Sequence, residues 1–184
     1  RAVRGSSISE GARRVLVTRP EPAAGTEAEA LSALGLAPVL WPITGIRHLA
    51  TRLALPEGTE ALVFTSAHGV AAFAAASRLR DLPAYCVGAR TAEAARAEGF
   101  VDARSADGDA AALARLLAGA PETRFFHARG ENVAGDLAGA LAAAGKTLEA
   151  AVLYRAEDLG PPPEHVRAAL IGGEIGAAGF WSPR

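Results

Sequence analysis

Short apolar runs alternate along the chain with longer segments rich in Ala and Leu. Runs such as Val15–Val17 and Leu62–Phe64 are continuous and do not alternate with polar residues, which predicts strands covered on both faces. Several intervening segments stop at a glycine typical of a helix end, such as Gly35 and Gly145. Repeated strand–helix units at this spacing predict parallel sheets joined by right-handed crossovers. The expected fold class is therefore α/β.

The pattern also places the individual elements. Breaks at residues 47–58 and 159–163 are expected to be linkers, and a single doubly wound sheet is the alternative to two sheets. Thr26 and Thr91 are expected to open helices. The expected strands are 15–17, 38–41, 62–64, 85–87, 101–104, 124–127, 148–154 and 177–181. Two of the expected helices follow Thr26 and Ser66, and the others cover residues 92–98, 109–117, 137–144 and 166–170.

Composition narrows the class of protein. Lys and Arg number 19 against 20 Asp and Glu, a net charge of −1, which argues against a general binder of nucleic acid or another polyanion. Half of the residues are hydrophobic, enough for a folded core, yet no apolar stretch is long enough to span a membrane. The single cysteine, Cys86, excludes a disulfide framework and a multi-cysteine metal site. We expect a soluble cytoplasmic protein without membrane or nucleic-acid partners.

The two ends of the chain have unusual features. The sequence contains no methionine, so Arg1 is not a native initiator. Residues 1–13 are polar and irregular, which is typical of a flexible extension. The chain finishes at Phe180–Arg184, where a strand would just have ended, and strands rarely stop with their backbone groups unpaired. We therefore expect residues to be missing after Arg184.

The familiar cofactor and hydrolase motifs are absent. Gly173 and Gly176 have the wrong spacing for a dinucleotide fingerprint, and no phosphate loop, zinc-binding H-E-x-x-H or nucleophile elbow occurs. Cys86 lies in an apolar run and is interpreted as buried packing. No metal and no cofactor is expected. The four histidines, His48, His68, His127 and His165, are scattered and are interpreted as structural groups.

Hydrogen-bond donors recur where the predicted strands end. Ligands of open parallel sheets bind outside the carboxyl ends of the strands, and the helix N-termini at the same edge favour anions. Hydroxyls, small residues and arginines in these places indicate a mostly neutral pocket for carboxylates. Ser and Thr are also ordinary helix N-caps, and that simpler interpretation stays open for each of them. These junctions contain Thr18, Arg19, Thr65, Ser66, Gly88, Thr91, Arg129, Gly130, Tyr154, Arg155 and Ser182.

Six short motifs resemble one known family when their order and spacing are taken together. Each motif alone is degenerate, but the set extends from about residue 14 to residue 184 in the order found in uroporphyrinogen-III synthases. The motifs are Val15–Pro20, Trp41–Ile43, Phe64–Ser66, Val87–Gly88 with Thr91, Leu153–Arg155 and Phe180–Pro183.

The resemblance implies two α/β lobes with parallel sheets, linked by a two-stranded hinge near residues 41–43 and 153–155. Lobe one would comprise residues 14–42 plus 156–184, and lobe two residues 43–155. Family members continue for several further strand–helix units, so lobe one is expected to be incomplete at its C-terminus. Trp41 and Trp181 are expected in the core.

The resemblance also implies a reaction. The substrate would be hydroxymethylbilane, a small linear tetrapyrrole with acetate and propionate groups, which the enzyme closes to uroporphyrinogen III with loss of water and inversion of the last ring. Catalysis would be mainly geometric, since holding one reactive conformer contributes ~7–11 kcal/mol in favourable cases. No cofactor or metal would be needed, and we expect a monomer. The alternatives are a non-catalytic two-lobed module that binds a small anion or tetrapyrrole and, more weakly, a nucleotide-dependent enzyme.

The resemblance assigns roles to the junction residues. Tyr154, at the end of the hinge strand, would act as a general acid or position the leaving hydroxyl. Arg129 and Asn132, where a helix is expected to begin, would clamp carboxylates. Hydroxyls and backbone N–H groups would bind the remaining carboxylates. The alternative interpretations are a packed aromatic ring for Tyr154, a solvated surface arginine for Arg129, and helix caps for the hydroxyl-bearing residues. The remaining substrate-binding candidates are Thr18, Arg19, Thr65, Ser66, Gly88, Thr91 and Ser182.

Overall fold

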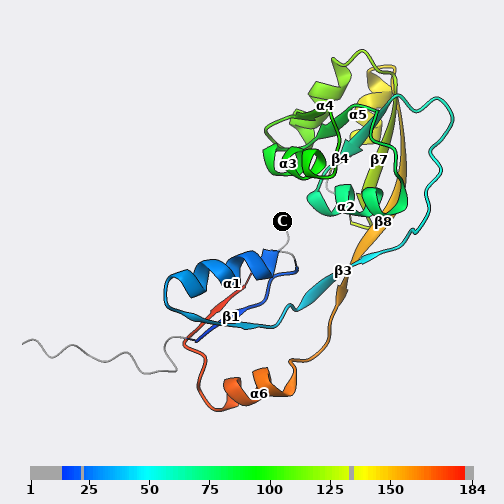
Figure 1. Ribbon diagram of the computed structural model, residues 1–184. Helices are drawn as coiled ribbons and strands as arrows, with labels where there is room; N and C mark the ends of the chain where they lie inside the picture. The colour runs from blue at the N-terminus through cyan, green and yellow to red at the C-terminus, as the bar shows by residue number, and fades with distance from the viewer. Residues whose placement is uncertain (1–13, 22, 133–134, 181–184) are drawn as a thin grey trace, which may run out of the picture. The chain divides into compact units, whose positions relative to one another are not determined.

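The chain divides into two compact units. A computed structural model describes residues 14–21, 23–132 and 135–180 (Figure 1). Unit 1 combines residues 1–46 with 157–184, and unit 2 covers residues 47–156. The two boundaries between the units fall after residues 46 and 156. The expected boundaries, after residues 42 and 155, lie four residues and one residue earlier. Each unit has its own sheet, so the alternative of a single doubly wound sheet is wrong.

Unit 1 contains a three-stranded parallel sheet with the order β2-β1-β9. Leu16 and Val17 of the central strand are buried, whereas Ala177 and Ala178 of β9 are exposed. The expectation that both faces of every strand are covered is therefore wrong for β9, an edge strand built from small residues. Trp41 is half-buried, and Trp181 lies outside the described residues. The elements are β1 (Arg14–Val17), α1 (Ala23–Ala33), β2 (Ala37–Leu40), α6 (Glu164–Ile171) and β9 (Ala177–Gly179).

Unit 2 is built on a larger sheet of six strands in the order β3-β8-β7-β4-β5-β6. The pairs β8–β7, β7–β4, β4–β5 and β5–β6 are parallel. Strands β3 and β8 are neighbours, and both cross the boundary between the units. The elements are β3 (Thr44–His48), β4 (Ala61–Phe64), α2 (Ala67–Ala76), β5 (Ala84–Cys86), α3 (Ala89–Ala97), β6 (Ala103–Ser105), α4 (Ala110–Ala118), β7 (Arg124–Gly130), α5 (Leu137–Ala143) and β8 (Thr147–Asp158).

Two strands differ from expectation in a way that concerns the site. β3 extends into the segment expected to be a linker. It was not expected as a strand because its sequence, Thr-Gly-Ile-Arg-His, has no continuous apolar run. β8 is longer than expected, so Tyr154 lies inside the strand and not at its end. The placement of Tyr154 at the strand end was therefore wrong, because β8 continues to Asp158 beside β3, although Tyr154 is the last of its residues that pairs with β7.

The core of unit 2 has one apolar cluster on each face of the sheet. Leu62 and Phe64 of β4 pack with residues of α2 and α3, whereas Ala61 and Val63 pack with residues of α4 and α5. This alternation follows from the two-residue period of a strand. All four β4 side chains are buried, as its continuous apolar sequence predicts. Cys86 is buried in the first cluster, which confirms its structural interpretation, and burial raises the pKa of its thiol to about 11.

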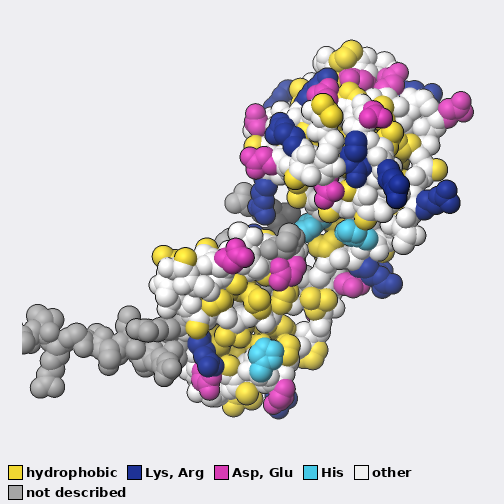
Figure 2. All heavy atoms as spheres, viewed as in Figure 1, with side chains coloured by type: hydrophobic (Ala, Val, Ile, Leu, Met, Phe, Trp, Pro, Cys, Tyr) yellow, Lys and Arg dark blue, Asp and Glu magenta, His cyan; other side chains and the backbone are white. Residues whose placement is uncertain are grey.

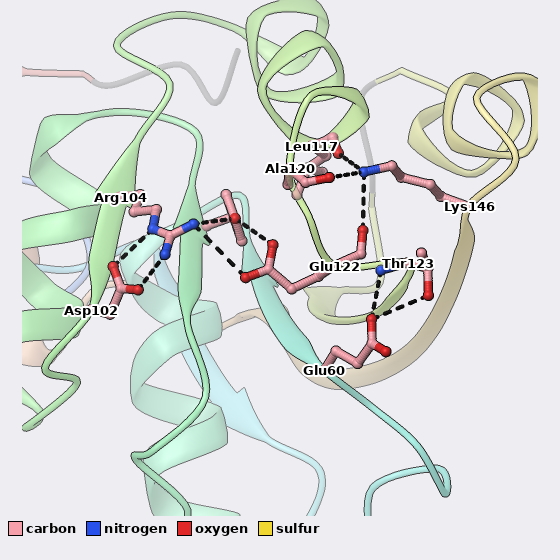
Figure 3. A network of polar contacts seen from close by, with 9 residues as sticks. Glu60, Asp102, Arg104, Leu117, Ala120, Glu122, Thr123 and Lys146 are labelled. Carbon is pink, nitrogen blue, oxygen red and sulfur yellow. Dashed lines mark hydrogen bonds and ion pairs between the residues drawn. The ribbon is translucent and has the colours of Figure 1, made fainter.

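Polar contacts tie elements together at the amino edge of this sheet (Figure 3). Lys146, just before β8, donates from Nζ to the carbonyl oxygens of Leu117 and Glu122, at 2.9 and 3.0 Å, and to that of Ala120. It thereby joins the last turn of α4, through Leu117, to the segment that follows the helix, through Ala120 and Glu122. Glu60, just before β4, accepts from the backbone N–H of Thr123 at 2.6 Å. These contacts stabilise the amino edge of the sheet, which is opposite to the carboxyl ends of the strands, where ligands are expected.

An arginine-centred group belongs to the same network. Arg104 forms a bidentate ion pair with Asp102, with distances of 2.9 and 2.5 Å. Arg104 also donates to the hydroxyl of Tyr85, which in turn donates to Glu122 Oε2 at 2.7 Å. Burial, with a contribution from Glu122, raises the pKa of Tyr85 to about 12. Tyr85 is therefore a neutral structural donor.

Candidate active site

The carboxyl edge of the six-stranded sheet brings three predicted site residues together. Thr65 and Ser66 follow β4 directly, and Tyr154 comes from β8. β7 lies between these two strands, and all three run in parallel, so their carboxyl ends meet at one edge. The strand order places residues from distant parts of the chain where ligands of such sheets bind.

Ser66 connects the tyrosine to a helix N-terminus. Its backbone is extended, and its Oγ accepts a hydrogen bond of 3.1 Å from the N–H of Gly69, which makes it the N-cap of α2. The same Oγ lies 2.6 Å from the hydroxyl of Tyr154, and either hydroxyl can donate. The helix-cap interpretation of Ser66 is confirmed. Its role as a substrate ligand stays a prediction, which the cap does not exclude, because the same oxygen also contacts Tyr154.

Two glycines near the site allow close approaches, one of the tyrosine ring and one of a helix to a strand. Gly130 pairs with Tyr154 next to an irregularity in the β7–β8 register, and a Cβ at Gly130 would lie 2.8 Å from Cζ of that ring. A Cβ at Gly69 would lie 2.6 Å from the carbonyl oxygen of Ala128. Neither approach is compatible with a side chain of ordinary van der Waals size. The absence of a side chain at Gly130 therefore leaves room for the ring of Tyr154, and the absence of one at Gly69 lets α2 approach the backbone of β7.

Thr65 has a buried histidine as its partner. Its Oγ1 lies 3.1 Å from Nε2 of His127, which comes from β7 and is only 2% exposed. Burial, with a smaller effect of Arg129, lowers the pKa of His127 to about 4, so the imidazole is neutral at neutral pH. His127 was interpreted from the sequence as a structural group. The only sequence signal that His127 could belong to the site was its position two residues before Arg129, on the same side of a strand.

His68 gives the edge a second imidazole. It lies in the first turn of α2, with its ring centroid 5.9 Å from that of Tyr154. Burial, followed by the positive charges of Arg90 and His48, lowers its pKa. The first turns of α2 and α3 carry no acidic residue. The charge of Arg90 and the positive ends of the two helix dipoles thus favour an anion here. Acidic and basic side chains are, in contrast, interspersed on the face of unit 2 drawn in Figure 2.

Gly88 and Thr91 belong to the next junction, between β5 and α3. Gly88 is the N-cap of α3, with extended backbone and open space where a Cβ would project. Thr91 is the third residue of the helix and is 6% exposed, with its N–H bonded to the carbonyl of Gly88 at 3.0 Å. The expectation that Thr91 opens the helix is wrong, because Gly88 takes the cap position. Its role as a substrate ligand stays a prediction.

Arg129 and Asn132 lie at the end of β7. Arg129 is inside the strand, and its Nη1 donates to the carbonyl oxygens of Gly130 and Glu131, at 3.1 and 3.2 Å. Asn132 is exposed. The next helix begins at Leu137, as expected, with Asp136 as its N-cap, so the placement of Arg129 and Asn132 at a helix start was wrong. β7 extends to Gly130, three residues beyond its expected end at His127, so Arg129 lies inside the strand.

Thr18 and Arg19 follow β1 in unit 1. The Thr18 hydroxyl donates to the carbonyl oxygen of Gly179 at 2.6 Å and is nearly buried, so it links β1 to the end of β9. Nη1 of Arg19 lies 3.5 Å from a carboxylate oxygen of Glu27 in α1. α1 begins at Ala23, three residues before the expected start. Ser182, the last candidate, lies outside the described residues.

Two further features of the described ranges concern ligands and membranes. No group of three or more His, Cys, Asp or Glu side chains suited to a metal ion occurs within them. None of their helices has the length and apolar character of a membrane span, and α1, with 11 residues, is the longest.

Comparison with known protein families then identifies the chain. The family model described as uroporphyrinogen-III synthase HemD matches residues 26–184. The chain belongs to this family. The family's members are cyclising lyases of tetrapyrrole biosynthesis, which is the function of this chain, and their substrate is a tetrapyrrole. A comparison with curated proteins found no match.

Solved structures of the same family share the fold. A mutant uroporphyrinogen III synthase from Thermus thermophilus superimposes with a TM-score of 0.51 and 22% identity, covering 90% of this chain and 71% of that one. The enzyme from Helicobacter pylori has a TM-score of 0.57 and 17% identity, covering 85% and 68%. At these identities the likeness concerns the α/β fold. It confirms the expected fold class.

Proposed function

We propose that the carboxyl edge of the six-stranded sheet is where this family member binds hydroxymethylbilane and converts it to uroporphyrinogen III. The pair formed by Ser66 and Tyr154, 2.6 Å apart at the N-terminus of α2, carries this proposal. It joins a hydroxyl able to transfer a proton to a helix end that attracts anions.

The substrate is held through its acetate and propionate groups. The hydroxyl of Thr65 and the backbone N–H groups after Ser66 and Gly88 supply neutral donors. Arg90 lies in the first turn of α3, and its charge acts on His68 in the first turn of α2. Arg129 and Thr91 are further ligands in this proposal, as is the exposed Asn132. Several donors along one edge suit a substrate that carries several carboxylates, because each carboxylate accepts more than one hydrogen bond.

Tyr154 takes part in the first chemical step. Its phenol donates a proton to the hydroxyl of the substrate as the C–O bond breaks, and that hydroxyl leaves as water. Ser66 orients the phenol through their shared hydrogen bond. The cationic carbon formed is attacked by the substituted carbon of the last ring, and rearrangement inverts that ring. The proton finally lost from the macrocycle restores the phenol, so the net change is loss of one water.

The remaining catalysis is conformational. A flexible chain of four rings must be folded so that the substituted carbon reaches the cationic carbon, and contacts that restrict rotation lower the entropic part of the barrier. We also propose that a single copy of the chain acts in the cytoplasm and needs no nucleic acid. A net charge of −1 and a small-molecule substrate agree with this.

The two tyrosines of the chain provide a matched experiment. Tyr154→Phe removes the hydroxyl at the site, and Tyr85→Phe removes one from the network at the opposite edge. With enzymatically generated hydroxymethylbilane, we expect Tyr154→Phe to lower kcat by about 100-fold, the lower end of what a single acid–base group contributes. Tyr85→Phe should keep kcat and reduce only stability. Chromatography of the type I and type III isomers provides the readout.

Two results would contradict the proposal. A wild-type kcat in Tyr154→Phe would remove the tyrosine from the mechanism. Formation of type I isomer alone by folded wild-type protein would remove the reaction itself, and substrate affinity without turnover would then indicate a binding module.

A further inference from the structure

We propose that His127 is a positioning residue for the reaction, whose buried imidazole holds the hydroxyl of Thr65 so that its proton points to a substrate carboxylate. This inference rests on the proposed function of the carboxyl edge. It assigns a role to a side chain that has no direct part in the chemistry described above.

The strand register brings the two side chains together. His127 of β7 pairs with Val63 of β4, and Thr65 follows Val63 by two residues, so it continues on the same face. The resulting distance between Nε2 and Oγ1 is 3.1 Å. His127 is 2% exposed, whereas Thr65 is partly exposed. Thr65 therefore has a buried partner while part of its surface stays open to a ligand.

The surroundings of His127 argue for a specific use of its ring. The other buried side chains of β7 are apolar, namely Phe125, Phe126 and Ala128. A buried polar group destabilises the fold unless it is hydrogen-bonded, and an apolar residue would have packed here without that cost. The contact with Thr65 compensates for this cost. A histidine at this position therefore indicates that the orientation of the threonine hydroxyl matters.

The direction in which the Thr65 hydroxyl donates follows from the hydrogen-bond donors and acceptors of its two partners. When Nε2–H donates to Oγ1 of Thr65, a lone pair of that oxygen is occupied and its own proton is left to donate outward. A carboxylate only accepts, so it completes a chain from His127 through Thr65 to the substrate. Burial and the charge of Arg129 lower the pKa of His127, which keeps the ring neutral at neutral pH. The imidazole then orients the hydroxyl without adding a second buried charge.

A double-mutant cycle tests this role. His127→Leu removes the ring nitrogen, Thr65→Val removes the hydroxyl at nearly constant volume, and the double variant removes both. We expect each single substitution to raise KM for hydroxymethylbilane about tenfold, the loss typical of a hydrogen bond to a charged group. The double variant should be less than about twofold worse than Thr65→Val alone, because the histidine acts only through the threonine. His127→Gln, whose amide can replace Nε2–H, should stay within about threefold of wild type.

Each contrary result has its own meaning. Losses that multiply in the double variant, an unchanged KM in His127→Leu, or His127→Gln as impaired as His127→Leu would overturn the positioning role. An unchanged KM in Thr65→Val would overturn both that role and substrate binding by Thr65, while type III product would still support the family function. If His127→Leu does not fold, which circular dichroism would show, His127→Gln and its combination with Thr65→Val decide the same question.

Discussion

The hydroxyls of Ser66 and Tyr154 lie 2.6 Å apart, although 88 positions separate them in the chain. Ser66 is held by its bond from the N–H of Gly69 in α2, and Tyr154 is held by the pairing of β8 with β7. The contact therefore links the N-terminus of α2, the helix that follows β4, to β8, which is separated from β4 in the sheet by β7. A phenol fixed in this way loses little conformational entropy when the substrate binds.

Removal of the serine hydroxyl should affect both function and stability. In Ser66→Ala, Tyr154 loses its partner and α2 loses its N-cap, so we expect kcat to fall about tenfold and stability to fall by about 1 kcal/mol. Asp109→Ala is the matched control, because Asp109 caps α4 through a 2.9 Å bond from the N–H of Ala112. It should show a similar loss in urea unfolding with unchanged kcat. Equal kcat values for the two variants would argue against the role of the pair.

Gly130→Ala should displace the tyrosine ring. The added Cβ would meet Cζ of Tyr154 at 2.8 Å and Cε2 at 2.9 Å, so the ring must move. We expect kcat to fall about tenfold, since a small displacement of a catalytic group is costly. Gly119→Ala serves as the control, because its Cβ would make only ordinary contacts, with 3.8 Å as the shortest distance. Wild-type kcat in Gly130→Ala would show that the site tolerates a shifted ring.

The buried imidazole of His127 should make stability depend on pH. Its pKa falls from 6.5 to about 4 on folding, so between these values the unfolded chain binds a proton that the folded chain does not. Stability is thus highest above pH 6.5 and decreases as the pH falls towards 4, by about 3 kcal/mol at most. Urea unfolding at several pH values should show a smaller decrease for His127→Gln. Parallel curves for both proteins would mean that other groups cause the effect.

Lys146 should contribute to stability without affecting catalysis. Its ammonium group donates to three backbone carbonyls near the end of α4, at the edge opposite to the site. We expect Lys146→Met to reduce stability by about 1–3 kcal/mol, because these buried carbonyls lose a charged donor. Arg78→Met, at an exposed position, should change stability by less than about 0.5 kcal/mol. Both variants should keep the wild-type kcat, and a loss of activity in Lys146→Met at full folding would contradict this separation of the two edges.

Elements with a clear local signal in the sequence were predicted from that signal. Continuous apolar runs identified β1 and β4, and Gly35 and Gly145, both with positive φ, end their segments as expected. β3 was missed because its residues carry no such run. Thr91 was misplaced because an extended glycine, Gly88, provides the N-cap, and glycine leaves a weaker cap signal than Ser or Thr.

For this protein the sequence alone determined the α/β class and the donor-rich strand ends, because each depends on residues close together in the chain. It also determined the family resemblance, because the order and spacing of the six motifs can be read along the chain. The tertiary structure decided which strand ends become neighbours. The order β8-β7-β4 pairs Ser66 with Tyr154 and Thr65 with His127. Strand order and register depend on long-range packing of apolar faces, and the two-residue period of a strand cannot specify the partner. A histidine that looked incidental in the sequence therefore gained a contact at the site only through folding.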